Sequence, residues 1–257
     1  MCGLNRQVRE TYADLIAKGV QGNQRAVARF LSLVESEDPE AVSTVHSLNR
    51  GATWAPVIGI TGYPGVGKST LVNQLIRLYR RQDKKVGVLA IDPSSSRTGG
   101  ALLGDRIRMQ EHATDPGVFI RSMATRGHHG GLAQRTQDVV QALPALGYDI
   151  IIIETVGVGQ GEIDIVTVAN VVVAVLAPGL GDDIQAMKAG LLEIAHIVVV
   201  NKKDLKGADT ALRYLKEWVP CVIPTQALTG EGVEEVASAI AARVVRPQPA
   251  GTVAHSG

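Results

Sequence analysis

The chain has 257 residues, of which 26 are Lys or Arg and 25 are Asp or Glu, so its formal net charge is +1. This balance argues against a general nucleic-acid or membrane-surface binder, in which basic residues would outnumber acidic ones. Hydrophobic residues make up 45% of the chain and aromatic residues only 4%. We therefore expect a globular protein whose core is built from Val, Ile, Leu and Ala.

Targeting and redox features are weak in this sequence. No apolar run reaches the roughly 18–20 residues that a membrane span needs. The N-terminus also lacks the apolar stretch of a signal peptide. Cys2 and Cys221 form no pair with metal or redox spacing. These observations predict a cytoplasmic protein without a membrane partner.

The first 55 residues predict a helical extension. Apolar residues recur at helical spacing over 8–16 and again over 26–34, and Asp38-Pro39 opens a third short helix that runs to about Leu48. We expect residues 1–55 to cap the main domain. A docking surface for a partner is the competing interpretation.

From Pro56 onward the pattern alternates between strand and helix, and several of the strands are apolar on both faces, as in 150–153 and 171–173. Parallel strands covered by helices on both sides have this composition. The sequence therefore predicts an α/β fold with a doubly wound, mostly parallel sheet over 56–245 and a flexible tail over 246–257. The predicted strands are 57–61, 85–91, 118–121, 149–154, 170–177, 197–201 and 221–224, with helices at 69–81, 132–146, 183–194 and 210–218.

A phosphate-binding loop follows the first predicted strand. Its residues are Gly62, Tyr63, Pro64, Gly65, Val66, Gly67, Lys68, Ser69 and Thr70, and they open the helix over 69–81. The glycines allow successive backbone N–H groups to face a phosphate at a helix N-terminus. Lys68 is expected to reach the β- and γ-phosphates, and the Ser69 hydroxyl to bind Mg²⁺. A P-loop NTPase is predicted.

A second motif specifies the base. Asn201, Lys202 and Asp204 form an N-K-x-D string at the end of a buried strand. The Asp204 carboxylate can accept hydrogen bonds from the N1–H and 2-amino groups of guanine, a donor pair that adenine lacks. Downstream, Gln226, Ala227 and Leu228 follow another strand, where we expect the backbone N–H of Gln226 to bond the base oxygen. The predicted ligand is GTP/GDP.

Three carboxylates are candidates for an Mg²⁺ site beside Ser69. Asp92 and Glu154 each follow a predicted strand, and Asp105 lies in a Gly-rich loop. Because the carboxyl ends of parallel strands meet at one edge of a sheet, these side chains should converge on the metal. Lys68, Asp92 and Glu154 are the candidate catalytic residues.

At this point the sequence resembles a known family. The strings 62–70, 92–95, 98–100, 104–109, 126–128, 154–160 and 181–185 are similar to those of the MeaB/ArgK/MMAA family. Its members are SIMIBI-class P-loop GTPases that act as chaperones of adenosylcobalamin-dependent acyl-CoA mutases, chiefly methylmalonyl-CoA mutase. The resemblance covers about residues 8–243.

The resemblance implies further roles. Mobile switches would lie at 92–109 and 154–165, and a further switch at 179–188 would sense the mutase. The residues implied in coupling to the partner are Gln160, Asp182, Asp183, Gln185 and Lys188. Family members form a homodimer through helical arms that follow the last sheet helix. This chain has only 12 residues after Val245, so a homodimer is left open.

Hydrolysis is expected to be slow until a partner orders the switches, because Val158 stands near the place where Ras-like enzymes carry a water-positioning Gln. A nickel-insertion GTPase chaperone is one alternative, but it would need a His/Cys-rich patch that His128-His129 does not supply. A P-loop small-molecule kinase would need an acceptor site and no N-K-x-D string. A nucleotide-gated binding module with negligible catalysis is the third. The client mutase is left open.

Overall fold

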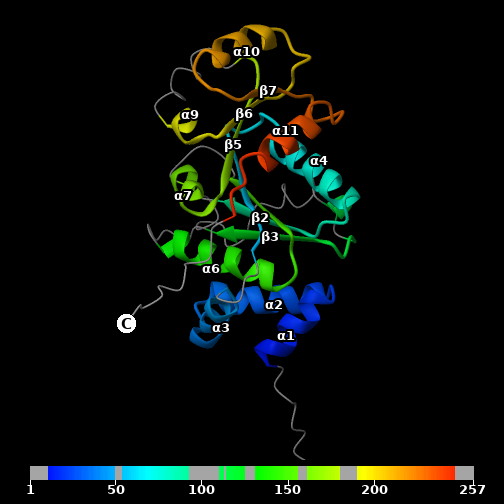
Figure 1. Cartoon of the computed structure of the whole chain (residues 1–257), viewed down its shortest axis with the longest axis vertical. Helices are drawn as coiled ribbons and strands as arrows, with labels where there is room; N and C mark the ends of the chain where they lie inside the picture. The colour runs from blue at the N-terminus through cyan, green and yellow to red at the C-terminus, as the bar shows by residue number, and fades with distance from the viewer. Residues whose placement is uncertain are drawn as a thin grey trace, which may run out of the picture.

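A single parallel sheet organises the molecule. In a computed structural model, the described residues are 11–49, 54–92, 110–112, 114–124, 131–155, 161–179 and 190–246. Within them, seven strands lie in the order β3-β2-β4-β1-β5-β6-β7, and every neighbouring pair is parallel (Figure 1). The strands are β1 (Val57–Thr61), β2 (Val86–Asp92), β3 (Val118–Ala124), β4 (Ile150–Thr155), β5 (Val171–Leu176), β6 (Ile197–Val200) and β7 (Val222–Pro224).

Helices cover both faces of this sheet, which confirms the predicted doubly wound α/β fold. The alternating residues of one strand show why. Ile152 of β4 packs in the core beneath α4 (Lys68–Arg81) and α11 (Val233–Ala241), whereas Ile151 and Ile153 pack beneath α6 (Gly131–Ala145) and α7 (Gly161–Val168). All three isoleucines are fully buried. A smaller core joins β5 and β6 to α9 (Leu191–Ile194) and α10 (Ala208–Lys216).

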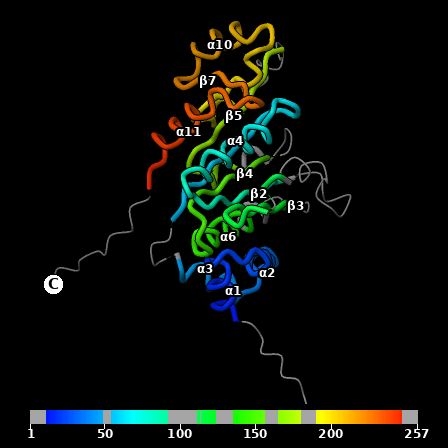
Figure 2. Tube along the Cα trace, turned by 90° about the vertical axis from the view of Figure 1, so that its right-hand side faces the viewer, coloured from blue at the N-terminus to red at the C-terminus, as the bar shows by residue number. Residues whose placement is uncertain are grey.

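The predicted N-terminal helices are present as α1 (Tyr12–Val20), α2 (Gln24–Glu35) and α3 (Pro39–Asn49). Side-chain caps start each of them: Thr11 forms a capping box, Asn23 accepts from two backbone N–H groups, and Asp38 accepts from Ala41 N–H at 2.9 Å. Phe30 of α2 is fully buried in the core shared with α6. Helices α2 and α3 pack against α6, and α1 packs against α2 (Figures 1 and 2).

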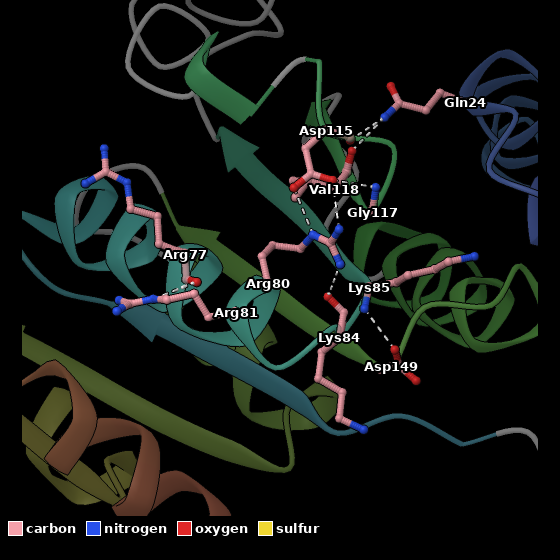
Figure 3. Close-up of polar contacts among 10 residues, drawn as sticks. All are labelled: Gln24, Arg77, Arg80, Arg81, Lys84, Lys85, Asp115, Gly117, Val118 and Asp149. Carbon is pink, nitrogen blue, oxygen red and sulfur yellow. Dashed lines mark hydrogen bonds and ion pairs between the residues drawn. The ribbon is translucent and has the colours of Figure 1, made fainter.

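Polar contacts fasten these helices to the amino ends of the strands (Figure 3). The Gln24 amide donates to the carbonyl oxygens of Asp115 and Val118 at 3.0 and 2.9 Å. The Lys85 ammonium donates to Val20 O at 2.8 Å. Since Lys85 directly precedes β2 and Val118 begins β3, the extension is attached to two strands of the sheet.

Some element boundaries differ from those expected. Strand β3 continues to Ala124 rather than ending at 121, because it pairs with β2 residue by residue from Val118 to Ala124. Helices α7 and α11 and the short 3-10 turn η1 (Gln110–His112) were not among the predicted elements. Of the helix predicted over 183–194, only α9 falls in the described part of the chain. None of the helices in that part is both long and apolar enough to cross a membrane.

Candidate functional site

The loop between β1 and α4 depends on glycine at two positions. Gly62 has φ 140° and Gly67 has φ 100°, both in the region that side chains disfavour. A Cβ atom at Gly62 would lie 2.2 Å from Val175 O, and one at Gly67 would lie 2.2 Å from Asn201 Nδ2. The backbone therefore curls tightly against β5 and against the loop after β6, and α4 begins at Lys68 directly behind it.

This loop offers donors for an anion. No hydrogen bond within the described residues engages the backbone N–H groups of Gly65, Gly67 or Ser69. They stand at the N-terminus of a 14-residue helix, where the helix dipole favours negative charge. A phosphate chain fits this combination of donors and field.

The Lys68 side chain folds back across the loop. Its ammonium donates to Gly62 O at 2.7 Å and to Tyr63 O at 3.0 Å, and the residue is only 7% exposed. A phosphate oxygen is a stronger acceptor than these neutral carbonyls because it carries charge. The Lys68 ammonium thus lies against the phosphate-binding loop, and its contact with a phosphate stays a prediction.

Two of the predicted metal-binding residues touch. The Ser69 hydroxyl donates to Glu154 Oε1 at 2.6 Å, and both residues are buried. Hydroxyl and carboxylate oxygens are ligands that suit Mg²⁺, so the oxygen atoms of Ser69 and Glu154 fit the ion. Asp92 ends β2 beside them, since Ala90 pairs with Glu154. The Asp92 side chain and all of Asp105 lie outside what the structure describes.

The base side of the site is organised by Asn201. Its Nδ2 donates to Val66 O at 2.9 Å, while its Oδ1 accepts from Thr225 Oγ1 at 3.1 Å and from Ala227 N–H at 2.9 Å. Asn201 and Thr225 are buried. One amide therefore joins the phosphate-binding loop to the loops that follow β6 and β7.

Lys202 adds a second connection, because its ammonium donates to Gly65 O at 2.7 Å. Asp204 lies at the surface, and in the described part of the chain it forms no hydrogen bond or ion pair. An exposed carboxylate with its acceptors available is what recognition of two guanine donors requires.

The turn over 226–228 differs from the expectation in one detail. The N–H of Gln226, the predicted donor, donates to Glu231 O at 3.0 Å, and the N–H of Ala227 donates to Asn201, so both groups are engaged within the chain. Leu228 is 82% exposed, and no hydrogen bond among the described residues uses its N–H. Of the three backbone N–H groups on this turn, that of Leu228 is therefore the one that no described residue engages.

Two residues of the site had no assigned role in the sequence. Thr225 bonds Asn201, and its burial at a strand end is the signal that could have found it. Glu231 accepts from Gln226 and pairs with Lys203, and no motif marks it.

Among the described residues, no group of three or more His, Cys, Asp or Glu side chains could hold a metal. The proposed coupling residues Gln160, Asp182, Asp183, Gln185 and Lys188 lie outside those residues.

The sequence is similar to those of known proteins from one family. Residues 27–255 match the family model described as methylmalonyl Co-A mutase-associated GTPase MeaB. A Pyrococcus horikoshii protein named as a GTPase is 52% identical over 236 residues, covering 87% of this chain and 74% of that protein. A fused isobutyryl-CoA mutase of Cupriavidus metallidurans is 42% identical over 199 residues, covering 76% of this chain and 18% of that protein.

A solved structure agrees with these matches. The crystal structure of an LAO/AO transport system kinase covers 91% of this chain and 75% of its own, with a TM-score of 0.69 and 28% sequence identity. The family match spans well over half of the chain and includes the phosphate-binding loop and the N-K-x-D string. The chain belongs to the MeaB family of methylmalonyl-CoA mutase-associated GTPases.

Proposed function

We propose that this GTPase is a metallochaperone-type protein that assists the assembly and protection of an adenosylcobalamin-dependent acyl-CoA mutase. Methylmalonyl-CoA mutase is the first candidate client, because the family description names it. The fused isobutyryl-CoA mutase contains a stretch similar to this chain. Both relations support a partner of the acyl-CoA mutase class.

The observation that carries the proposal is the 2.6 Å contact between Ser69 and Glu154. It joins the first turn of the phosphate-binding helix to the end of β4, where the second switch implied by the resemblance begins. In this proposal Ser69, Asp92, Asp105 and Glu154 hold or support Mg²⁺, which when bound neutralises charge on the β- and γ-phosphates. Replacement of the Ser69–Glu154 hydrogen bond by Mg²⁺ would move the Glu154 side chain, and the segment that follows Glu154 would respond.

The remaining assignments extend the proposal to the phosphates and the base. The loop over 62–70 binds the phosphates, with Lys68 at the β- and γ-phosphates. Asp204 accepts from the N1–H and 2-amino groups of guanine, and Leu228 N–H donates to the base oxygen. Asn201 and Lys202 fix the base loops to the phosphate loop. The ligands are GTP and GDP.

Coupling to the client is assigned to Gln160 and to the segment that contains Asp182, Asp183, Gln185 and Lys188. Hydrolysis is slow in the isolated protein and accelerates when the mutase orders these segments. Binding of the mutase and turnover of GTP are then two readouts of one equilibrium between switch states.

The test is GTP hydrolysis by the purified protein, alone and with methylmalonyl-, isobutyryl- and ethylmalonyl-CoA mutases, with ATP as the control nucleotide. We expect slow GTP turnover that rises with one mutase, which identifies the client. GTP turnover that is indifferent to every mutase would remove the client assignment and leave a GTPase. A preference for ATP would overturn the role of Asp204.

A further inference from the structure

The two loops that face the guanine come from different strands. One follows β6 and carries Asp204, and the other follows β7 and carries Leu228. Guanine presents O6, N1–H and the 2-amino group along one edge of a rigid base, so the carboxylate and the backbone donor can bind this edge together only at a fixed separation. Whatever fixes these loops against each other therefore affects selectivity.

Buried contacts fix the inner part of the two loops. Lys203 N–H donates to Thr225 O at 3.0 Å, and Thr225 Oγ1 donates to Asn201. These bonds lie at the strand ends, beneath the exposed Asp204 and Leu228. They do not fix the outer rim of the two loops, by which we mean the exposed residues around Asp204 and Leu228.

Glu231 contacts both loops at this outer rim. The Glu231 carboxylate forms an ion pair with the Lys203 ammonium, and Lys203 is the immediate neighbour of Asp204. The backbone oxygen of the same Glu231 accepts the N–H of Gln226 at 3.0 Å. The N–H groups of Thr229 and Gly230 both donate to Gln226 O, which closes the turn that presents Leu228.

We propose that Lys203 and Glu231 form a latch that positions Asp204 against the turn over 226–228 and so contributes to selectivity for guanine. Lys203 occupies the variable position of the N-K-x-D string, so the motif itself assigns it no role. Both are positioning residues, because they act through Asp204 and Leu228 and not on the base. The inference rests on the proposed placement of guanine at Asp204.

The test is the dissociation constant of GDP, with ADP for comparison, for the full chain and for Glu231→Gln, which keeps the backbone contact to Gln226 and removes the charge. Glu37→Gln is a matched control. It breaks the Arg135–Glu37 ion pair, whose side chains are 29% and 55% exposed, against 31% and 55% for Lys203 and Glu231.

We expect Glu231→Gln to weaken GDP binding about three- to five-fold, a range set by the strength of exposed ion pairs. ADP binding and the thermal midpoint without nucleotide should match those of Glu37→Gln. The difference in GDP affinity should shrink in 1 M salt, where exposed charges are screened. GDP affinity within 1.5-fold of the original protein would overturn the latch.

Charge reversal provides a second arm. Lys203→Glu and Glu231→Lys should each weaken GDP binding, and the double variant should restore it to within about two-fold if the ion pair is what matters. Failure of the double variant to restore binding would also overturn the proposal. Asp204→Asn separates the two ideas: if it leaves guanine preference intact, the base placement is wrong, whereas if only Glu231→Gln is silent, the latch alone is wrong.

Discussion

Charged residues have different partners at the two ends of the strands, which we call the amino edge and the carboxyl edge of the sheet. At the amino edge, the Arg80 guanidinium donates to both carboxylate oxygens of Asp115 at 2.9 and 3.0 Å, and Gly117 N–H donates to Asp115 at 2.8 Å (Figure 3). At the carboxyl edge, the Lys68 ammonium donates to two neutral carbonyl oxygens, and the Asp204 carboxylate faces solvent.

This difference indicates what each edge is for. A carboxylate that receives a bidentate Arg and a backbone donor has its acceptors used within the chain, so it stabilises the fold. A phosphate oxygen can replace the carbonyl oxygens that accept from Lys68, because it carries charge, and the exposed Asp204 carboxylate accepts no hydrogen bond from the described residues. The residues at the amino ends of the strands therefore serve the structure and the attachment of α2, and those at the carboxyl ends are the ones proposed to bind the nucleotide. Substitutions at the carboxyl edge should lower activity with little effect on stability, and substitutions at the amino edge should lower stability with little effect on activity.

The largest effect is expected at Lys68. Lys68→Ala should lower single-turnover GTP hydrolysis about 10²–10³-fold, because it removes a preorganised charge from the phosphate site. Its thermal midpoint should stay near that of the original protein. Lys84→Ala, which removes an exposed lysine at the amino edge, is the control and should leave hydrolysis unchanged. A loss smaller than about tenfold in Lys68→Ala would place the phosphates elsewhere.

The second effect concerns the choice of base. Asp204→Asn should weaken GDP binding about 10–100-fold, since hydrogen bonds to a charged acceptor are worth about 1.5–3 kcal/mol. Binding of xanthosine diphosphate should improve, because its 2-oxo group accepts from an amide where guanine donates. Competition against a fluorescent guanine nucleotide measures both values. Asp209→Asn, another exposed acid, is the control, and equal losses in the two variants would contradict the assignment.

The smallest effect is expected at the amino edge and should appear in stability. Asp115→Asn should lower the free energy of unfolding at pH 7 by about 1–2 kcal/mol, because Arg80 loses a charged partner. Hydrogen bonds from the Arg80 side chain lower the pKa of Asp115 below its ordinary value of 3.8. The stabilisation is therefore complete above that value and is lost as the pH falls through the lower, folded-state pKa.

Denaturant unfolding from pH 7 to pH 2 measures this dependence. The difference between the original protein and Asp115→Asn should be constant at neutral pH and should shrink below about pH 4. GTP hydrolysis at 25 °C and pH 7 should differ by less than about two-fold, because the protein stays folded. An Asp115→Asn protein that loses hydrolysis without losing stability would contradict the division between the two ends of the strands.

Much of the fold follows from local sequence. Strand β1 was predicted at its observed limits, Val57–Thr61, because an apolar run lies between Pro56 and Gly62. Residues 122–124 of β3 were not predicted, because the polar residues Arg121 and Ser122 end its apolar run. In the structure Arg121 forms an ion pair with Glu35 of α2, a contact between residues 86 positions apart. Periodicity within one segment carries no information about such a partner.

The same limit applies to the site. Motifs identified the residues that are proposed to meet the nucleotide, such as Lys68 and Asp204, because spacing around a glycine-rich turn or a strand end defines them. They did not show that Asn201 bonds Val66 O and Ala227 N–H, or that Gln226 N–H is engaged by Glu231. These contacts join loops that are distant in the chain, so they depend on how the strands are ordered in the sheet.

In the proposed function, the nucleotide state of this protein and its binding of the mutase are coupled. The most direct measurement is the dissociation constant of methylmalonyl-CoA mutase for the protein loaded with GDP and with a non-hydrolysable GTP analogue. We predict a difference between the two states, within about 5–150-fold, and by linkage an equal effect of the mutase on the ratio of nucleotide affinities. Identical dissociation constants in the two nucleotide states would contradict the account.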